Sequence, residues 1–290
     1  MNARETATRL GLKRLAHSWR GRCPACDYPG TFSIRERRDG TAFLACASCH
    51  DRDALVLAIA RATGQDYRPE PPDDGNETAT RQRKSDFALR LWNGSAAASG
   101  TLVERYLAAR GLAGLEDSSA LRFRPDTPHP EGIGAGARYP AMIALVTSAG
   151  GAALAIHRTY LRADGTGKAA VEPAKASLGP IWGGAIRLQS LDPGKQLVIG
   201  EGIETAASAG RLMGLPAWAA IAAGNLGKGL VLPPEARRIV IAADPDEPGR
   251  DAARAAWSRW RAEGRDVQIA TPNGPEDFND LLRMREVPHA

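Results

Sequence analysis

The stretch Leu197-Val198-Ile199-Gly200-Glu201-Gly202 decides the fold, because an apolar run ends there on an acidic residue. A second apolar run, 239–243, ends in the same way on Asp244-Pro245-Asp246. Each run is short, rich in β-branched residues and followed by a helix-like segment, which indicates a buried strand of a parallel sheet. In open α/β sheets, ligands gather beyond the carboxyl ends of the strands. The sequence therefore predicts that Glu201, Asp244 and Asp246 converge at one edge of a sheet.

Three carboxylates at one edge repel one another unless a cation lies between them. A hard divalent ion with oxygen ligands, Mg²⁺ or Mn²⁺, suits such a site, and phosphate is its usual second partner. A polar turn with a helix-capping Asp would explain one of these acids but not the whole set. The acidic edge therefore makes phosphoryl-transfer chemistry on nucleotides a candidate function.

Residues 191–290 alternate between strand and helix patterns. We expect strands at 196–200, 216–222, 238–243 and 266–270, and helices at 203–213, 249–263 and 278–284. This alternation is typical of a parallel sheet with crossover helices, which is an α/β fold.

The preceding segment, 86–190, has a different pattern. Apolar residues at helical spacing over 86–116 predict two helices around a Gly/Ser/Ala break at 94–100, and strands are expected at 141–147, 153–161 and 186–188. This indicates a mixed α+β subdomain. Residues 65–85 are rich in proline and charged residues and poor in large apolar ones, so they predict a flexible linker.

Residues 1–64 predict a zinc ribbon. Cys23-Pro-Ala-Cys26 and Cys46-Ala-Ser-Cys49 are two knuckles separated by the 19 residues 27–45, a spacing typical of zinc sites. The segments 31–34 and 42–44 indicate a hairpin between the knuckles. Four thiolates suit tetrahedral Zn²⁺ and leave no ligand position open, so the zinc is expected to be structural.

The bulk properties of the chain limit its class. It has 290 residues, and 38 Lys and Arg against 33 Asp and Glu give a net charge of +5. That excess fits contact with nucleic acid, and it fits a solvated Arg-rich surface equally well. No apolar run is long enough to span a bilayer, and the polar N-terminus has no signal-peptide core. We therefore expect a cytoplasmic protein without a membrane partner.

The two acidic motifs, in this order and behind a zinc ribbon, resemble those of Toprim-domain primases. Two short sequences are most similar to primases of phages and plasmids, which are relatives of the bacterial DnaG enzymes. They are Glu-Gly-Ile-Glu-Thr-Ala at residues 201–206 and Asp-Phe-Asn-Asp-Leu-Leu at residues 277–282. The resemblance covers most of the chain except the linker. It implies a C-terminal Toprim domain with a Rossmann-like parallel sheet, preceded by the α+β subdomain of the polymerase core and the zinc ribbon.

The resemblance also implies an activity, the synthesis of short RNA primers on a single-stranded DNA template from NTPs. It assigns Asp244 and Asp246 to a catalytic Mg²⁺ or Mn²⁺ ion, with Asp277 and Asp280 as further ligands. Glu201 either ligates the metal or acts as an acid/base group.

The cations of such a site are expected in the middle region. By resemblance, Lys175, Arg158 and Lys168 line a basic cleft for template or nucleotide phosphates. An exposed charge at a turn is an equally good interpretation of Lys168. Gly202 would let the backbone approach the ion, and Arg250 would contact phosphate at the start of a helix.

The chain departs from the pattern of replicative primases in three ways. Thr205 replaces an Asp, a fourth Cys replaces a zinc-binding His, and no GxxxxGK[ST] loop is present, so any helicase would be a separate partner. Two alternatives stay open at this point. A Toprim nuclease uses similar acids to hydrolyse phosphodiesters, and a non-catalytic zinc-finger and Toprim module only binds DNA.

Overall fold

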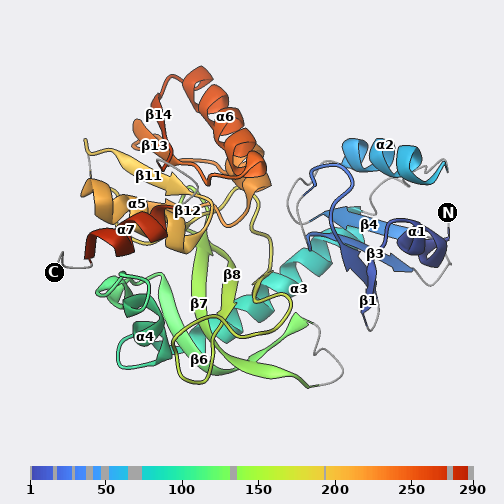
Figure 1. The fold of residues 1–290 in the computed structure, drawn as a ribbon, viewed down its shortest axis with the longest axis horizontal. Helices are drawn as coiled ribbons and strands as arrows, with labels where there is room; N and C mark the ends of the chain where they lie inside the picture. The colour runs from blue at the N-terminus through green and yellow to red at the C-terminus, as the bar shows by residue number, and fades with distance from the viewer. Residues whose placement is uncertain are drawn as a thin grey trace. The chain divides into compact units, whose positions relative to one another are not determined.

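The computed structural model describes residues 2–15, 18–27, 30–36, 42–46, 52–64, 74–130, 136–192, 194–272 and 277–286. The chain divides into two compact units (Figure 1). Unit 1 comprises residues 1–74 and 131–135, and unit 2 comprises residues 75–130 and 136–290. No helix within the described ranges has the length and apolar character needed to cross a membrane.

Unit 1 is a small antiparallel sheet with two helices. Its elements are α1 (Ala3–Arg9), β1 (Lys13–Leu15), β2 (Ser18–Gly21), β3 (Phe32–Glu36), β4 (Ala42–Cys46) and α2 (Arg52–Thr63), and the strand order is β1-β2-β3-β4. The predicted hairpin is confirmed as β3 and β4, whereas α1, β1 and β2 are additional. Phe32, Ile34 and Ile59 are fully buried and form the centre of its core.

The first part of unit 2 is a five-stranded antiparallel sheet. Its elements are α3 (Asp74–Asn93), β5 (Ala96–Ala97), α4 (Leu102–Ala108), the 3₁₀ turn η1 (Leu115–Asp117), β6 (Leu121–Pro128), β7 (Arg138–Thr147), β8 (Ala153–Tyr160) and β9 (Lys175–Leu178). The strands follow the order β5-β6-β7-β8-β9. The two predicted helices and their break are confirmed, and so are β7 and β8, while β6 and β9 were not expected.

The predicted linker 65–85 differs from the structure in its second half. Residues 74–85 belong to α3, and residues 65–73 lie outside the described ranges. Ala88, Leu91 and Trp92 of α3 are buried against the sheet, so tertiary packing holds the last turns of this helix. Adding a residue to a formed helix costs little, and the polar segment continues the helix towards its N-terminus.

The second part of unit 2 contains the parallel sheet. Its elements are β10 (Ile186–Arg187), β11 (Leu197–Gly200), α5 (Ile203–Met213), β12 (Ala217–Ala219), the π-helix η3 (Asn225–Gly229), β13 (Arg238–Ala242), α6 (Glu247–Ala262), β14 (Asp266–Ala270) and α7 (Phe278–Glu286). The strand order is β10-β12-β11-β13-β14, and every pair is parallel except β10 with β12.

All four strands and three helices predicted for this part are confirmed. One assignment is corrected, because 186–188 was expected in the antiparallel subdomain and β10 instead pairs with β12. The connection β11–α5–β12 and the connection β13–α6–β14 run outwards in opposite directions. Right-handed crossovers then place α5 and α6 on opposite faces of the sheet, as Figure 1 shows.

The two sheets of unit 2 share one apolar core. Alternate residues of β7 point to opposite faces, so Met142 and Ala144 join a cluster with Val198 of β11 and Ile203 of α5. Ala141 and Ile143 of the same strand pack on the other face, towards α3. The shared core fixes the antiparallel sheet against the parallel one.

Candidate active site

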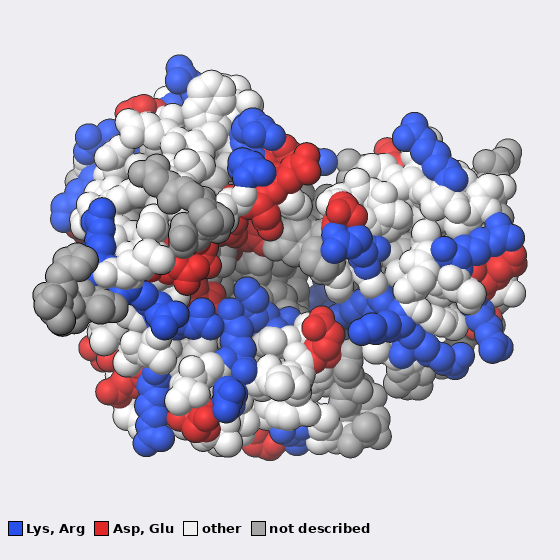
Figure 2. Space-filling view, in the orientation of Figure 1, with Lys and Arg blue, Asp and Glu red and all other residues white. Residues whose placement is uncertain are grey.

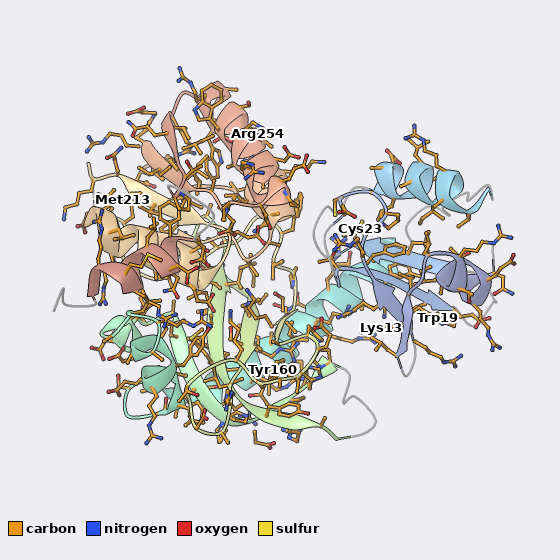
Figure 3. The ribbon with its side chains drawn as sticks, viewed as in Figure 1. Lys13, Trp19, Cys23, Tyr160, Met213 and Arg254 are labelled. Atoms are coloured by element: carbon orange, nitrogen blue, oxygen red, sulfur yellow. The ribbon has the colours of Figure 1, made fainter. Side chains whose placement is uncertain are left out.

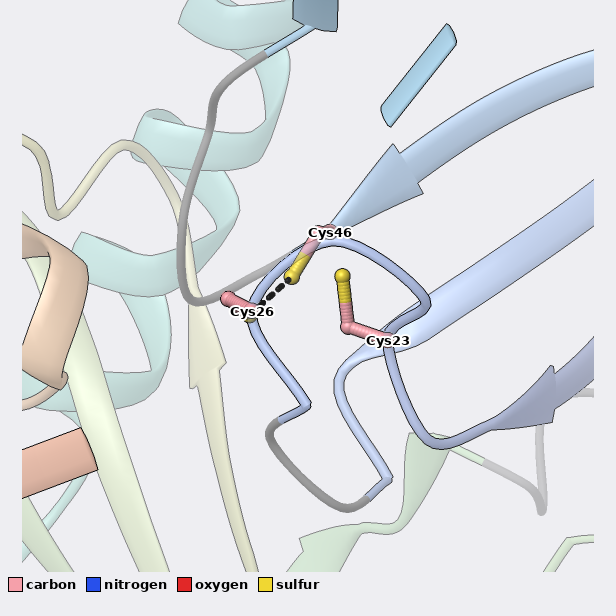
Figure 4. Close-up of side chains that lie close together, drawn as sticks. All are labelled: Cys23, Cys26 and Cys46. Carbon is pink, nitrogen blue, oxygen red and sulfur yellow. Dashed lines mark hydrogen bonds between the residues drawn. The ribbon is translucent and has the colours of Figure 1, made fainter. Parts of the chain in front are cut away.

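Three cysteines of unit 1 form a cluster that could hold a metal ion. Cys23 follows β2, Cys26 lies three residues on, and Cys46 ends β4; their sulfur atoms all lie within 4.8 Å of one another (Figure 4). The Sγ atoms of Cys26 and Cys46 are 3.7 Å apart. Tetrahedral Zn–S bonds of about 2.3 Å put sulfurs about 3.8 Å apart, so this spacing fits a structural zinc ion. The predicted fourth ligand, Cys49, lies outside the described residues.

The acidic residues of unit 2 lie where the topology predicts a ligand site. Gly200 of β11 pairs with Ala242 of β13, so Glu201 and the Asp244 turn leave the sheet on neighbouring strands at its carboxyl edge. The crossovers diverge between these two strands, which makes this point the topological switch of the sheet. Open α/β sheets bind ligands at such a switch point.

Asp244 carries an electrostatic cost that a cation would offset. Its Oδ1 accepts a 2.9 Å hydrogen bond from the Thr205 hydroxyl. Burial raises the pKa of Asp244, and the charges of Asp246 and Asp277 raise it further, while Thr205 and Lys175 act in the opposite sense. A partly buried carboxylate beside two others suits a hard divalent cation.

The carboxylates are spread along the edge rather than gathered into a tight cage. Within the described ranges, only the cysteine cluster brings three or more metal-binding side chains within 4.8 Å of one another. Mg²⁺ keeps several of its waters and binds proteins through one or two carboxylates. The spacing therefore fits a hydrated ion held by Asp244 and Asp246, with the other carboxylates as outer partners.

Two of these acids also cap helices. Oδ1 of Asp246 accepts a 2.7 Å hydrogen bond from Gly249 N at the start of α6. Oδ1 of Asp277 accepts from Asn279 N at 2.8 Å and from Asp280 N at 2.9 Å at the start of α7. Capping thus explains part of the sequence pattern, and it also fixes the orientation of each carboxylate.

Glycines permit the close packing of this edge. A Cβ atom on Gly249 would lie 2.7 Å from Asp246 Oδ1 and 2.9 Å from Asp244 Cβ. A Cβ atom on Gly200 would lie 2.9 Å from Ala206 N, so Gly200 serves the packing of β11 on α5. Gly202 occupies the N-cap position of α5.

The side chain of Arg250 is exposed and donates to the Pro245 carbonyl.

The backbone beside Glu201 is strained. Ile221, after β12, has a φ of 79°. Left-handed backbone costs a non-glycine residue about 1–2 kcal/mol, and a β-branched side chain is rare there. Ile221 N donates a 2.7 Å hydrogen bond to the Glu201 carbonyl, which holds the two loops together. Such strain is typical of functional sites.

The antiparallel sheet supplies the basic side of the site. Thr159 pairs with Lys175 and His157 with Ser177, so these four residues share one face of β8 and β9. His157 is buried and lies 3.0 Å from the Ser177 hydroxyl. Burial, together with the charge of Lys175, lowers the pKa of His157 to about 3, so this imidazole is neutral at physiological pH. The Lys175 side chain is exposed.

Glu204 is a site residue that the sequence pattern did not reveal. Its Oε1 accepts a 2.5 Å hydrogen bond from the Tyr106 hydroxyl and lies 2.8 Å from Lys168 Nζ. Burial alone would raise the pKa of Glu204, but the charges of Lys175 and Lys168 outweigh it and lower the pKa. A charged residue directly before the small-residue run 205–210 was the available signal, because such a helix is buried on most sides.

Arg158 lies on the opposite face of the sheet from Lys175. Its guanidinium donates to three backbone carbonyls, those of Pro128 at 2.9 Å, Ala176 at 3.2 Å and Ser177 at 3.2 Å. It is 5% exposed, and its Cζ lies 5.9 Å from the ring of Tyr160, which Figure 3 labels. This position differs from the predicted cleft and indicates a structural role.

Acidic and basic side chains of unit 2 border a hollow. In the left half of Figure 2, acidic groups gather on the part that carries the parallel sheet, and basic groups face them from the antiparallel part. Lys175, at the start of β9, is near enough for its charge to act on both Glu204 and Asp244. The arrangement can hold a metal-bound polyanion between carboxylates and ammonium groups.

A parallel α/β sheet with carboxylates at its switch point defines the class of this site. Residues 196–286 match the Toprim domain family, and the chain therefore carries a Toprim domain. Residues 82–188 match a domain of unknown function, DUF7146. No curated protein matches the chain.

Solved primase structures show a distant similarity. The catalytic domain of a DnaG primase bound to single-stranded DNA aligns with 15% identity and a TM-score of 0.49, over 71% of this chain and 78% of that one. The primase fragment of the bacteriophage T7 primase-helicase aligns with 15% identity and a TM-score of 0.42, over 94% and 100%. The zinc-binding and RNA polymerase domains of the Aquifex aeolicus primase align with 13% identity and a TM-score of 0.45, over 98% and 80%.

Proposed function

We propose that this protein is a DNA primase that makes short RNA primers on single-stranded DNA from NTPs. One observation carries the proposal. Asp244 at the Toprim edge lies within electrostatic range of Lys175, an exposed lysine on the neighbouring sheet, with a hollow between the two parts. A site with this charge distribution fits a metal-bound triphosphate, which presents cations to the acids and anionic oxygens to the lysine.

The reaction is nucleotidyl transfer. The 3′-hydroxyl of the growing primer attacks the α-phosphorus of an NTP, a new P–O bond forms, and pyrophosphate leaves. In this chain, Asp244 and Asp246 would hold Mg²⁺ or Mn²⁺, with Asp277 as an outer partner. The metal, when bound, supplies charge stabilisation to the attacking oxygen and the leaving group. Thr205 orients Asp244, and the α6 cap orients Asp246.

Lys175 is the cation that we assign to the triphosphate. Its side chain is exposed, whereas Arg158 is buried among carbonyls and Lys168 is paired with Glu204. The negative charge of Glu204 lies within range of both Lys168 and Lys175. It therefore reduces the repulsion between these two lysines before nucleotide binds.

Unit 1 would bind the DNA template. Its exposed or half-exposed cations include two that stack on aromatic rings, with the Cζ of Arg14 5.4 Å from the Trp19 ring centroid and that of Arg35 5.3 Å from the Phe43 ring centroid. Arginine over an aromatic ring can bind both phosphate and base of a single strand. Zinc in the cysteine cluster would hold this surface in shape.

A synthesis assay tests the proposal. The protein is incubated with single-stranded DNA, labelled NTPs and Mg²⁺ or Mn²⁺, and labelled oligonucleotides are expected. Asp246→Asn should abolish synthesis. Asp266→Asn is the matched control, because Asp266 is an exposed acid at the opposite, amino edge of the same sheet, and it should leave synthesis unchanged.

Other products would identify the alternatives. No labelled oligonucleotide at any metal or template would reject the primase proposal. Fragmentation of the DNA would indicate a Toprim nuclease, and DNA binding without either product would indicate a non-catalytic module.

A further inference from the structure

Trp182 is a large aromatic residue exposed near the acidic edge. The residue is 41% exposed, and it lies in the segment before β10. Because β10 runs antiparallel to β12, with Ile186 opposite Ala219, the residues before β10 lie at the carboxyl end of β12. Glu201 leaves the sheet at that same edge, and its carbonyl accepts the hydrogen bond from Ile221. Trp182 therefore lies on the same side of the Toprim sheet as the proposed metal site.

The indole ring packs against a glycine. A Cβ atom on Gly229 would lie 2.6 Å from Cδ2 and 2.7 Å from Cε2 of Trp182. These two atoms form the central bond of the ring system, so the backbone of Gly229 contacts the middle of the indole. A side chain at position 229 would displace the ring. The glycine thus acts as a flat support beneath the tryptophan.

The support is itself held rigidly. Asn225 is fully buried, its Oδ1 accepts from Gly183 N at 2.9 Å, and its Nδ2 donates to Gly184 O and Ala220 O at 2.9 and 2.8 Å. These bonds tie the backbone next to Trp182 to the end of β12. Asn225 lies in the glycine-rich loop that follows β12, and these contacts explain why its amide is buried.

Arg259 of α6 fixes the other end of the π-helix η3. Its guanidinium donates to the carbonyls of Leu226, Gly227 and Leu230 at 3.3, 3.3 and 2.9 Å. π-Helical turns are rare and occur frequently at functional sites. Because Asn225 and Arg259 hold the loop that supports Trp182, the indole ring loses little conformational entropy when a ligand stacks on it.

We propose that Trp182 stacks on a base of single-stranded nucleic acid that passes the Toprim edge. This inference rests on the proposed primase function. Aromatic platforms beside positive charge bind single strands without sequence preference. Lys228 is exposed and directly precedes Gly229, so a cation lies next to the ring support. Val231 is a second exposed apolar residue close to Trp182, since its backbone N donates to Gly183 O. Trp182 and Val231 together are too few for a protein interface of ordinary size.

Binding of single-stranded DNA tests the inference. The probe is a fluorescent oligothymidylate, and its dissociation constant is measured by anisotropy over a series of salt concentrations. Trp182→Ala should weaken binding by about 5- to 150-fold, the effect of losing one stacked base, while Trp182→Phe retains most of the affinity. The slope of log affinity against log salt should stay unchanged, because no phosphate contact is lost.

Two further variants complete the test. Gly229→Ala should weaken binding as well, because it displaces the ring without removing it. Phe87→Ala is the matched control, since Phe87 is also 41% exposed but lies on α3, and it should leave binding unchanged. Circular dichroism establishes that each variant is folded.

The possible failures are distinguishable. If wild type binds the oligonucleotide and Trp182→Ala binds as tightly, the stacking proposal is wrong while the primase proposal stands. A decreased salt slope in Trp182→Ala, or equal losses in Trp182→Ala and Phe87→Ala, would also overturn it. A wild-type protein that neither binds the oligonucleotide nor makes primers would overturn the proposed function itself.

Discussion

Lys168 Nζ lies 2.8 Å from Oε1 of Glu204, and this ion pair connects the segment between β8 and β9 to the helix that follows the Toprim glutamate. Glu204 is three residues after Glu201, at the first turn of α5. The resemblance to primases predicted a phosphate contact for Lys168. In the structure, Lys168 neutralises Glu204, and Lys175 is the cation closer to solvent.

Glu204→Gln should destabilise the fold. The substitution removes the negative charge that compensates Lys168 and Lys175. Breaking a buried ion pair costs about 3–5 kcal/mol, and we expect a loss near 3 kcal/mol because the Lys168 side chain is about a quarter exposed. Urea denaturation at pH 7 measures this loss. A variant as stable as wild type would contradict the assignment.

The same variant should alter the dependence of stability on acid pH. The folded pKa of Glu204 lies below the ordinary value of 4.5, so its contribution is fully present above about pH 4.5 and is lost as the pH falls towards the folded pKa. The difference in unfolding free energy between wild type and Glu204→Gln should therefore decrease between pH 5 and pH 3. An unchanged difference over this range would show that the carboxylate is not held in its charged form.

Lys175→Ala and Arg158→Met should separate a nucleotide contact from a structural one. Lys175→Ala removes an exposed side chain, so we expect normal stability and at least a tenfold loss of NTP affinity. Arg158→Met removes a buried guanidinium that donates to three backbone carbonyls, so we expect a loss of about 2–4 kcal/mol in stability and little change in NTP affinity of the folded protein. Urea denaturation and NTP titration together measure both effects. The reverse outcome would restore Arg158 to the cleft.

Thr205→Val should weaken divalent-metal binding. The Thr205 hydroxyl orients Asp244 through a 2.9 Å hydrogen bond, and the loss of an outer-shell partner typically costs 10- to 100-fold in metal affinity. Thr205→Ser retains the donor and should bind Mn²⁺ as wild type does. Electron paramagnetic resonance of free Mn²⁺ measures the affinity. If the valine and serine variants bind equally, the hydroxyl has no such role.

Cys26→Ser should remove the zinc ion. We expect about one zinc per chain in wild type and almost none in the variant, because three of the predicted thiolates form one cluster. Unit 1 should then become sensitive to protease, since structural zinc contributes most of the folding free energy of small zinc modules. The core of unit 2 contains none of the cysteines, so residues 75–290 should resist. Atomic absorption measures the metal, and full zinc content in Cys26→Ser would refute the site.

The sequence predicts the parallel sheet well because each strand there is a short apolar run between helices with clear boundaries. It does not reveal β10 as part of this sheet, since two residues carry no period and their pairing with β12 is set by tertiary contacts. The missed strand β9 is likewise short and begins at a lysine.

The positions of the basic residues show the same limit. His157 and Arg158 are neighbours in the sequence, and because side chains alternate along a strand they lie on opposite faces of the antiparallel sheet. Which face meets the Toprim sheet depends on packing, so the pattern alone assigned Arg158 and Lys175 the same role. The acids were easier to predict, because the carboxyl ends of neighbouring parallel strands meet at one edge whatever the side-chain packing.

The most direct measurement is Mn²⁺ binding to wild type and to the double variant Asp244→Asn, Asp246→Asn. We expect wild type to bind Mn²⁺ and the double variant to lose that binding, with its zinc content and circular dichroism unchanged. The control Asp266→Asn should bind as wild type does. If the double variant retains wild-type Mn²⁺ affinity, the carboxyl edge of the Toprim sheet is not a metal site, and the primase proposal loses its chemical basis.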